Sequence, residues 1–204
     1  MRAARAIPVP DGVPDVVAGS TMLRGLTAHY LLDGSAHPAA GDTILLHAGA
    51  GGVGLILTQL AKRRGITVIT TVSTDEKAAL SAQAGADHVL RYGDDLVGQV
   101  RELTDGKGVP VVYDGVGADT FEQSLASTAV RGIVVTSLYL PNGNPQPGPK
   151  FDYKLAWFKR LRAHAAKLLK QDVPVVLAGD YNVAPTPFDI YPTRSWDKDA
   201  LIQP

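Results

Sequence analysis

Two kinds of segment alternate along the first two thirds of the chain. Short apolar runs predict buried strands at 42–47, 67–73, 88–92, 110–113 and 132–139. Apolar residues at helical spacing predict helices at 20–32, 54–64, 74–84, 94–103 and 119–127. Strands that alternate with helices of this length are typical of βαβ units, whose right-handed crossovers place helices on both faces of a parallel sheet. The predicted fold class is therefore α/β, with a doubly wound parallel sheet.

A glycine-rich turn follows the first predicted strand. Residues 49–54 form a G-x-G-x-x-G pattern that opens an amphipathic helix. In a Rossmann-like sheet such glycines allow a tight turn, close approach of the backbone to a dinucleotide diphosphate, and packing of the helix on the strand. Free N–H groups at the start of the helix then hold the diphosphate. The candidate cofactor-binding residues are Gly49, Gly51, Gly52, Val53 and Gly54; a glycine-rich turn without a ligand is the alternative.

The end of the second predicted strand indicates which dinucleotide would bind. An NAD site of this type carries an acid about 20 residues after the glycines, and no Asp or Glu occurs between Leu55 and Thr74. A hydroxyl at Ser73 and a cation at Lys77 suit a 2′-phosphate, so NADPH is the predicted cofactor rather than NADH. The alternative is a structural role, in which Ser73 and Glu76 form a capping box and Lys77 is a solvated helix residue.

The composition excludes several classes of protein. With 45% apolar and 20% charged residues, the chain is not disordered. Because 20 basic residues balance 20 acidic ones, the net charge gives no overall attraction to nucleic acid or to an anionic membrane. The chain has no Cys, which excludes a disulfide scaffold and a thiolate metal site, and no metal ligands are predicted. No window resembles a membrane span or a secretory leader, so we expect a cytoplasmic protein.

The composition changes abruptly near residue 136. Residues 1–136 hold 11 basic and 14 acidic side chains, whereas residues 137–204 hold 9 and 6. The second stretch, a third of the chain, carries 9 of the 13 aromatic residues and 9 of the 14 prolines. Such a shift predicts two segments of different origin, with a join near residues 131–137.

The first segment resembles a known family over residues 21–135. The resemblance is carried by LRGLTAHYLL, GDTILLHAGAGGVG, TVSTDEKAALSAQAGADHVLRY and VVYDGVG. These are similar to the nucleotide-binding domain of zeta-crystallin-type quinone oxidoreductases, of the medium-chain dehydrogenase/reductase superfamily. The resemblance implies a zinc-free enzyme that transfers hydride from NADPH to a quinone. It also implies that Tyr92 joins Ser73 and Lys77 at the 2′-phosphate, and that Val116 and Gly117 lie beside the nicotinamide half.

Members of that family carry an N-terminal catalytic domain that closes the substrate cleft, and the resemblance implies that Met1 follows that domain. Without an opposing wall, nothing orients a quinone or excludes water. We therefore expect cofactor binding with impaired turnover.

The second segment has a different pattern. Residues 151–171 predict an amphipathic helix and residues 173–178 a buried strand, which ends in Gly179-Asp180-Tyr181-Asn182. A carboxylate and a carboxamide two residues apart can point the same way as ligands for Mg²⁺ or a phosphoryl group; Asp and Asn also simply make turns after strands.

Residues 137–204 resemble a middle portion of the exonuclease III family of Mg²⁺-dependent DNA-repair phosphodiesterases. The motifs are SLYLPNGNPQPGPKFDYKLAWFKRL and PVVLAGDYNVAPTPFDIYPTRSW. The resemblance implies that Tyr139 is an active-site tyrosine and that Asp180 and Asn182 are a catalytic pair. The family's metal-binding Glu and Asp-His dyad have no counterpart here, so we expect neither hydrolysis nor a nucleic-acid partner.

Both segments fit one hypothesis, a chimera. Residues 1–136 form a dinucleotide-binding segment, residues 137–182 supply the last helix and strand of its sheet, and residues 183–204 form an irregular proline-rich tail. The expected function is an NADPH-binding module of the quinone reductase type; a phosphodiesterase fragment and an inactive scaffold are the alternatives. An exposed edge strand could pair with a second copy, which leaves a homodimer open.

Overall fold

The computed structural model describes residues 8–93, 95–171, 179–184, 186 and 199–202. Contacts within the chain divide it into two compact units, unit 1 (Met1–Thr136) and unit 2 (Ser137–Pro204). The boundary lies at the residue where the composition changes. Each unit is described by itself below.

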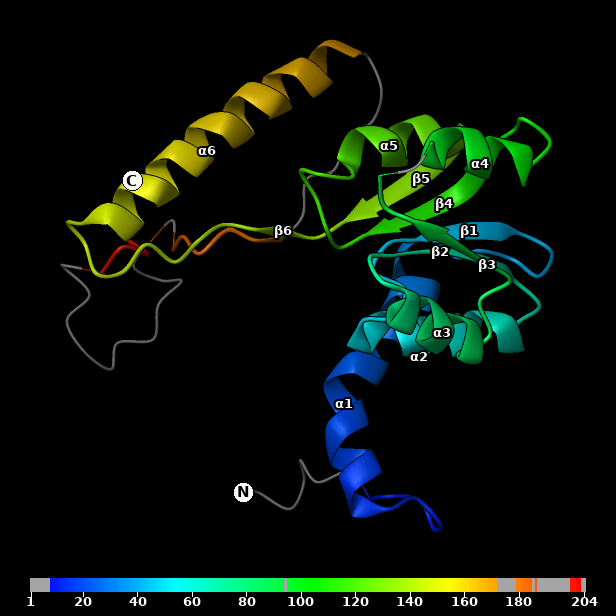
Figure 1. Ribbon diagram of the computed structural model, residues 1–204. Helices are drawn as coiled ribbons and strands as arrows, with labels where there is room; N and C mark the ends of the chain where they lie inside the picture. Colours follow the sequence, from blue (N-terminus) through cyan, green and yellow to red (C-terminus); the bar gives the residue numbers. More distant parts are fainter. Residues whose placement is uncertain (1–7, 94, 172–178, 185, 187–198, 203–204) are drawn as a thin grey trace. The chain divides into compact units, whose positions relative to one another are not determined.

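Unit 1 alternates helices and strands, as the hydrophobic pattern predicted (Figure 1). Its elements are α1 (Asp15–Tyr30), the short wide helix η2 (Leu31–Ser35), β1 (Thr43–Leu46), α2 (Gly52–Arg63), β2 (Thr67–Val72), α3 (Asp75–Gln83), β3 (His88–Arg91), α4 (Leu96–Glu102), β4 (Val109–Asp114), α5 (Phe121–Ser127) and β5 (Thr128–Thr136). No helix in the described part of the chain is long and apolar enough to cross a membrane.

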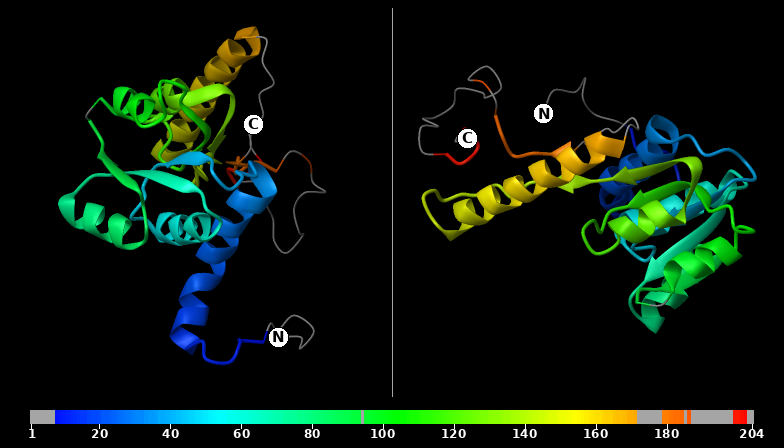
Figure 2. Two further views of the ribbon diagram at one scale, coloured as in Figure 1. Left: turned by 90° about the vertical axis from the view of Figure 1, so that its right-hand side faces the viewer. Right: turned by 90° about the horizontal axis from the view of Figure 1, so that it is seen from above.

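The five strands of unit 1 form one parallel sheet in the order β3-β2-β1-β4-β5. Helices α2 and α3 cover one face and α4 and α5 the other (Figures 1 and 2). This arrangement confirms the predicted doubly wound α/β fold. The strand order reverses between β1 and β4, and in open parallel sheets ligands bind outside the carboxyl ends of the strands at such a point.

Successive residues of β1 supply the two hydrophobic cores. Ile44 and Leu46 pack on one face against α2, while Leu45 packs on the other face against α4. All three are buried. Because full burial of such a side chain contributes about 1.5–3 kcal/mol, β1 is held firmly from both sides. The turn that follows β1 is therefore attached to a rigid strand.

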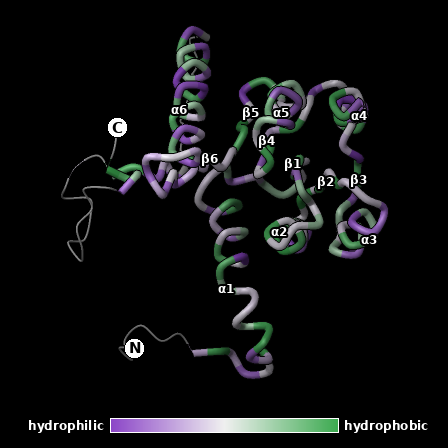
Figure 3. The backbone as a smooth tube through the Cα atoms, turned by 60° about the vertical axis from the view of Figure 1, so that its left-hand side comes forward, coloured by the Kyte–Doolittle hydropathy of each residue, from purple (hydrophilic) through white to green (hydrophobic). Residues whose placement is uncertain are grey.

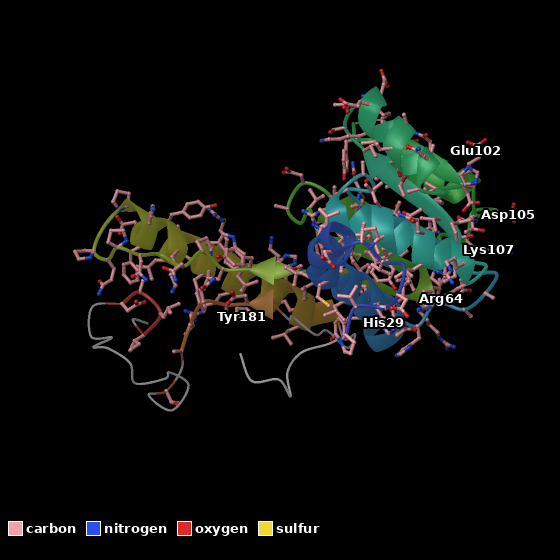
Figure 4. All side chains as sticks on the ribbon, turned by 90° about the horizontal axis from the view of Figure 1, so that it is seen from below. His29, Arg64, Glu102, Asp105, Lys107 and Tyr181 are labelled. Carbon is pink, nitrogen blue, oxygen red and sulfur yellow. The ribbon has the colours of Figure 1, made fainter. Side chains whose placement is uncertain are left out.

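An ion-pair cluster joins His29 of α1 and Asp33 of η2 to Arg64, the C-cap residue of α2. The Asp33 carboxylate accepts two hydrogen bonds from the Arg64 guanidinium, both 2.7 Å long, and lies 3.1 Å from Nδ1 of His29. His29 and Arg64 are labelled near each other in Figure 4. The guanidinium lowers the pKa of Asp33 below its ordinary value. His29 and Asp33 are exposed and Arg64 is half-buried, so the cluster adds little to the stability of the fold.

Unit 2 contains β6 (Leu138–Tyr139), α6 (Pro149–Leu168), the short helix η3 (Leu169–Gln171) and β7 (Gly179–Asp180). In α6, hydrophobic and hydrophilic residues alternate along the helix (Figure 3). Lys154 of α6 is buried, and its Nζ donates to three backbone carbonyls, those of Asn142 (3.2 Å), Asn182 (2.8 Å) and Ala200 (2.6 Å). This one side chain therefore joins three separate segments of unit 2.

The predicted strand 132–139 is wrong in its extent. Strand β5 begins earlier and ends at Thr136, and β6 pairs in parallel with β7 in a separate sheet. The register of β5 shifts where Arg131 adopts a φ of 65° next to Gly132. The predicted strand 173–178 lies outside the described residues. Among the described residues, the sheet of unit 1 has five strands, and the segment after 178 pairs with β6.

Candidate functional site

The turn between β1 and α2 is tight enough to require glycine. Ala48 has a φ of 54°, and the N–H of Gly51 donates to the Ala48 carbonyl over 2.8 Å. A Cβ on Gly54 would lie 2.5 Å from that same oxygen, and a Cβ on Gly49 would collide with the side chain of Thr70 in β2. Any larger residue at Gly49 or Gly54 would push α2 away from the sheet.

The N-terminus of α2 is left without a cap. Its N-cap residue is Gly51, which has no side chain to accept a hydrogen bond, and its first turn contains no acid. Among the described residues, nothing accepts from the backbone N–H groups of Gly52, Val53 or Gly54. These N–H groups carry the positive end of the helix dipole, so the turn is suited to an anionic ligand.

Ser73 and Lys77 meet just after β2. Nζ of Lys77 donates to Oγ of Ser73 over 3.0 Å, and both residues are exposed. The N-cap of α3 is Thr74, whose hydroxyl accepts from the N–H of Lys77 over 3.2 Å. The capping role considered for Ser73 is therefore wrong, and its hydroxyl is left beside the ammonium. Together they present one cation and one hydroxyl at the end of β2.

Tyr92 lies at the end of β3 and reaches back to the glycine turn. Its hydroxyl accepts a 2.8 Å hydrogen bond from the N–H of Ala48. Its ring stacks on His47, with ring centroids 6.0 Å apart and planes 14° from parallel. Tyr92 thus connects the carboxyl ends of β3 and β1 beside the glycine turn, where a dinucleotide is predicted to bind.

Asp114 ends β4 and organises the loop that follows it. Its Oδ1 accepts from the N–H groups of Val116 and Gly117, both over 2.9 Å. Its carboxylate also accepts from the hydroxyls of Thr120 (2.9 Å) and Ser124 (2.6 Å). Burial works to raise the pKa of Asp114, but these hydrogen bonds outweigh it and hold the pKa below its ordinary value. The residue is an ionised acceptor that fixes the backbone at Val116 and Gly117.

His47 links this network to β2. Nε2 lies 3.0 Å from Oγ of Ser124, and Nδ1 lies 2.9 Å from Oγ1 of Thr71. Since Ser124 donates to Asp114, it accepts from His47, so we assign the proton to Nε2. Burial lowers the pKa of His47, with the charge of Asp114 acting in the opposite direction. The neutral imidazole therefore ties the ends of β1, β2 and β4 beneath the glycine turn.

The residues singled out in unit 2 also come together. Tyr139 and Asp180 are opposite each other in the parallel pair β6–β7. A carboxylate oxygen of Asp180 accepts from the N–H of Asn182 over 2.8 Å, and Nδ2 of Asn182 donates to the Leu140 carbonyl over 2.6 Å. The described residues include no group of three or more His, Cys, Asp or Glu side chains that could hold a metal ion.

Sequence patterns did not identify His47, Asp114, Thr120 and Ser124 as a network. Nothing local reveals the network, because His47 and Ser124 are 77 residues apart. The sequence signal for it is a polar residue at the end of each of two buried strands, His47 and Asp114.

The fold and this site define a dinucleotide-binding α/β domain. A family described as zinc-binding dehydrogenase matches residues 52–176, more than half of the chain, and the match extends across the join predicted near 131–137. The chain therefore belongs to the zinc-binding dehydrogenase family, within the medium-chain dehydrogenase/reductase superfamily.

Three relatives define the similarity further. A quinone oxidoreductase of Pseudomonas aeruginosa is 48% identical over 133 residues, which are 65% of this chain and 41% of the relative. A 2-haloacrylate reductase of Burkholderia is 44% identical over 134 residues, covering 64% of this chain and 40% of the relative. The crystal structure of Escherichia coli quinone oxidoreductase complexed with NADPH superimposes with a TM-score of 0.63 at 43% identity, covering 66% of this chain and 41% of that one. The chain thus spans about two fifths of the length of these relatives.

Proposed function

We propose that unit 1 binds NADPH and is the cofactor-binding part of a reductase that acts on a quinone. The observation that carries the proposal is the uncapped N-terminus of α2 behind glycines that a side chain would obstruct. Support also comes from the relative whose crystal structure contains NADPH and from the quinone oxidoreductases at up to 48% identity.

The side chains present suit each part of this cofactor. The N–H groups of Gly52, Val53 and Gly54 would hold the diphosphate. Lys77 and Ser73 would hold the 2′-phosphate, with Tyr92 beside them. No Asp or Glu occurs between Leu55 and Thr74, the stretch in which an NAD site carries the acid that binds the ribose. Val116 and Gly117, fixed by Asp114, would lie along the nicotinamide half. When bound, NADPH supplies a hydride; the residues of unit 1 bind and orient it.

An equilibrium titration of the full chain with NADPH and, separately, NADH tests this function. We expect NADPH to bind more tightly than NADH, and we expect Lys77→Met to remove most of the difference. Equal affinity for both dinucleotides would contradict the assignment of Ser73 and Lys77. Absence of binding to either would contradict the proposed function as a whole.

Turnover is measured in the same samples as oxidation of NADPH on addition of a quinone. Binding without turnover is the result expected from the sequence. Steady oxidation that depends on the quinone would show that this chain is sufficient for hydride transfer.

A phosphodiesterase activity in unit 2 stays a prediction, made from the resemblance to the exonuclease III family. The observation that favours it is the meeting of Tyr139, Asp180 and Asn182 at the end of β6 and β7. One carboxylate and one carboxamide are a poor ligand set for Mg²⁺, which is bound through carboxylates together with phosphate oxygens and water. We therefore derive no hydrolytic step. Nicking of plasmid DNA in Mg²⁺ that Asp180→Ala abolishes would support the activity, and nicking that survives this substitution would show a contaminant.

A cytoplasmic location, a homodimer and the chimeric origin also stay predictions. For the homodimer, the supporting feature is β5, which forms one edge of the sheet and exposes Val130 and Ile133.

A further inference from the structure

The side chain of Arg24 lies on the first turn of α2. Arg24 belongs to α1, which packs beside α2 because Ala28 of α1 and Leu57 of α2 share one core. A Cβ built on Gly52 would be 2.7 Å from Cδ and from Nε of Arg24, and 2.9 Å from its Cζ. The guanidinium therefore lies directly against Gly52, the first residue of the helix.

This position is electrostatically unfavourable without an anion. The N-terminus of α2 carries a partial positive charge, and cations are disfavoured there. The first turn contains no acid that could offset the guanidinium. Arg24 is exposed, and in the part of the chain that the structure describes no hydrogen bond or ion pair engages its side chain. A guanidinium, a helix N-terminus and three free N–H groups thus converge on one exposed place.

We propose that Arg24 is a binding residue for the diphosphate of the dinucleotide. This inference rests on the proposed function, since it assigns a further contact within the same site. The guanidinium would donate to the phosphate oxygens from α1 while the N–H groups of Gly52, Val53 and Gly54 donate from α2. The planar fork of Arg matches two phosphate oxygens at once, which a Lys ammonium does not.

The assignment to the diphosphate follows from position. Arg24 lies against the glycine turn after β1, whereas Ser73 and Lys77 lie after β2. NADPH, NADH and ADP-ribose all carry the diphosphate, so Arg24 contributes to the affinity for all three. Adenosine 2′-monophosphate lacks the diphosphate, so its binding depends on the 2′-phosphate residues Ser73, Lys77 and Tyr92.

The experiment compares two variants of the full chain with one control. Arg24→Gln is expected to weaken binding of NADPH and of ADP-ribose about 10-fold, the loss of a hydrogen bond to a charged group, and to leave adenosine 2′-monophosphate unchanged. Arg24→Lys is expected to recover part of the affinity. Arg63→Gln removes the same charge from the exposed C-terminal end of α2 and is expected to change none of these affinities.

Thermal unfolding separates binding from a structural role. Removing a cation from a helix N-terminus relieves repulsion, so the ligand-free Arg24→Gln protein is expected to have a Tm equal to or above that of wild type. A lower Tm together with equally weakened binding of all ligands would overturn the proposal in favour of a structural role. Unchanged affinity of Arg24→Gln for NADPH would overturn it directly. Failure of the wild-type chain to bind NADPH is a different result, which contradicts the proposed function itself.

Discussion

Replacement of Asp114 by alanine is expected to destabilise unit 1 strongly. The carboxylate accepts from two backbone N–H groups and two hydroxyls, and the residue is only 2% exposed. Removing it leaves buried donors without their acceptor. Because the pKa of Asp114 is lowered in the folded protein, its contribution is present above the unfolded pKa of about 3.9 and is lost as the pH falls through the folded value.

The size of the effect can be worked out donor by donor. A buried donor without a partner costs about 1–3 kcal/mol. The Ser124 hydroxyl can donate to Nε2 of His47 once the imidazole proton moves to Nδ1, and the Thr120 hydroxyl can turn to the Gly117 carbonyl 3.3 Å away. Water can reach the exposed loop at Val116. The loss should therefore be about 3 kcal/mol for Asp114→Ala, well below the sum of four such costs. Asp114→Asn keeps the shape and one acceptor, and should cost about 1 kcal/mol.

Urea unfolding measured by two methods isolates the effect. Both tryptophans lie in residues 137–204, so tryptophan fluorescence reports unit 2 while far-ultraviolet circular dichroism reports both units. The control is Asp119→Ala, which removes an exposed carboxylate from the same loop. An Asp114→Ala protein within about 0.5 kcal/mol of wild type, the usual range for surface substitutions, would refute this reasoning.

Three further variants test other parts of the account. Burial lowers the pKa of His47, so His47 takes up a proton on unfolding below about pH 6.5 and the stability of unit 1 falls with the pH there. His47→Gln should make this fall in the free energy of unfolding shallower. His29→Gln, at an exposed position of α1, is the control. Gly54→Ala should abolish NADPH binding in a titration, because its Cβ would displace the turn. Lys154→Met should lower the free energy of unfolding of unit 2 by about 2 kcal/mol in tryptophan-monitored unfolding, because it leaves three carbonyls unpaired. An unchanged stability would contradict this, and would mean that the desolvation cost of the buried ammonium equals the gain from its hydrogen bonds.

Local patterns were sufficient for the frame of unit 1. The strands around Ile44 and Ile69 are buried on both faces, and such strands appear in sequence as short, continuous apolar runs. The glycine turn was predictable because its spacing follows from the geometry of a strand that leads into a helix. The unit boundary was also visible as a change in composition.

The remainder depends on contacts that sequence does not display. The hydrogen bonds of His47 and Asp114 join segments brought together by the folded sheet. The capping role of Thr74 instead of Ser73 is a shift of one residue, and capping patterns do not fix a helix start that finely. Strand 132–139 was misplaced because the irregular register at Arg131 interrupts the alternation on which the prediction relied.

Arg24 shows the same limit. In sequence Arg24 is a single exposed cation on a helix, and only the packing of α1 beside α2 places it against the glycine turn. The proposed binding role of Arg24 depends on its contact with the N-terminal end of α2, which the sequence alone does not reveal.

The central claim is that the glycine turn of unit 1 holds NADPH. A titration with NADPH followed by amide-resolved nuclear magnetic resonance tests it most directly. The account predicts that the largest shifts fall on residues 49–54 and on Ser73, Lys77, Tyr92 and Gly117, while Tyr139 and the other described residues of unit 2 do not respond. Unchanged amides at residues 52–54 in the presence of saturating NADPH, or the largest shifts in unit 2, would contradict it.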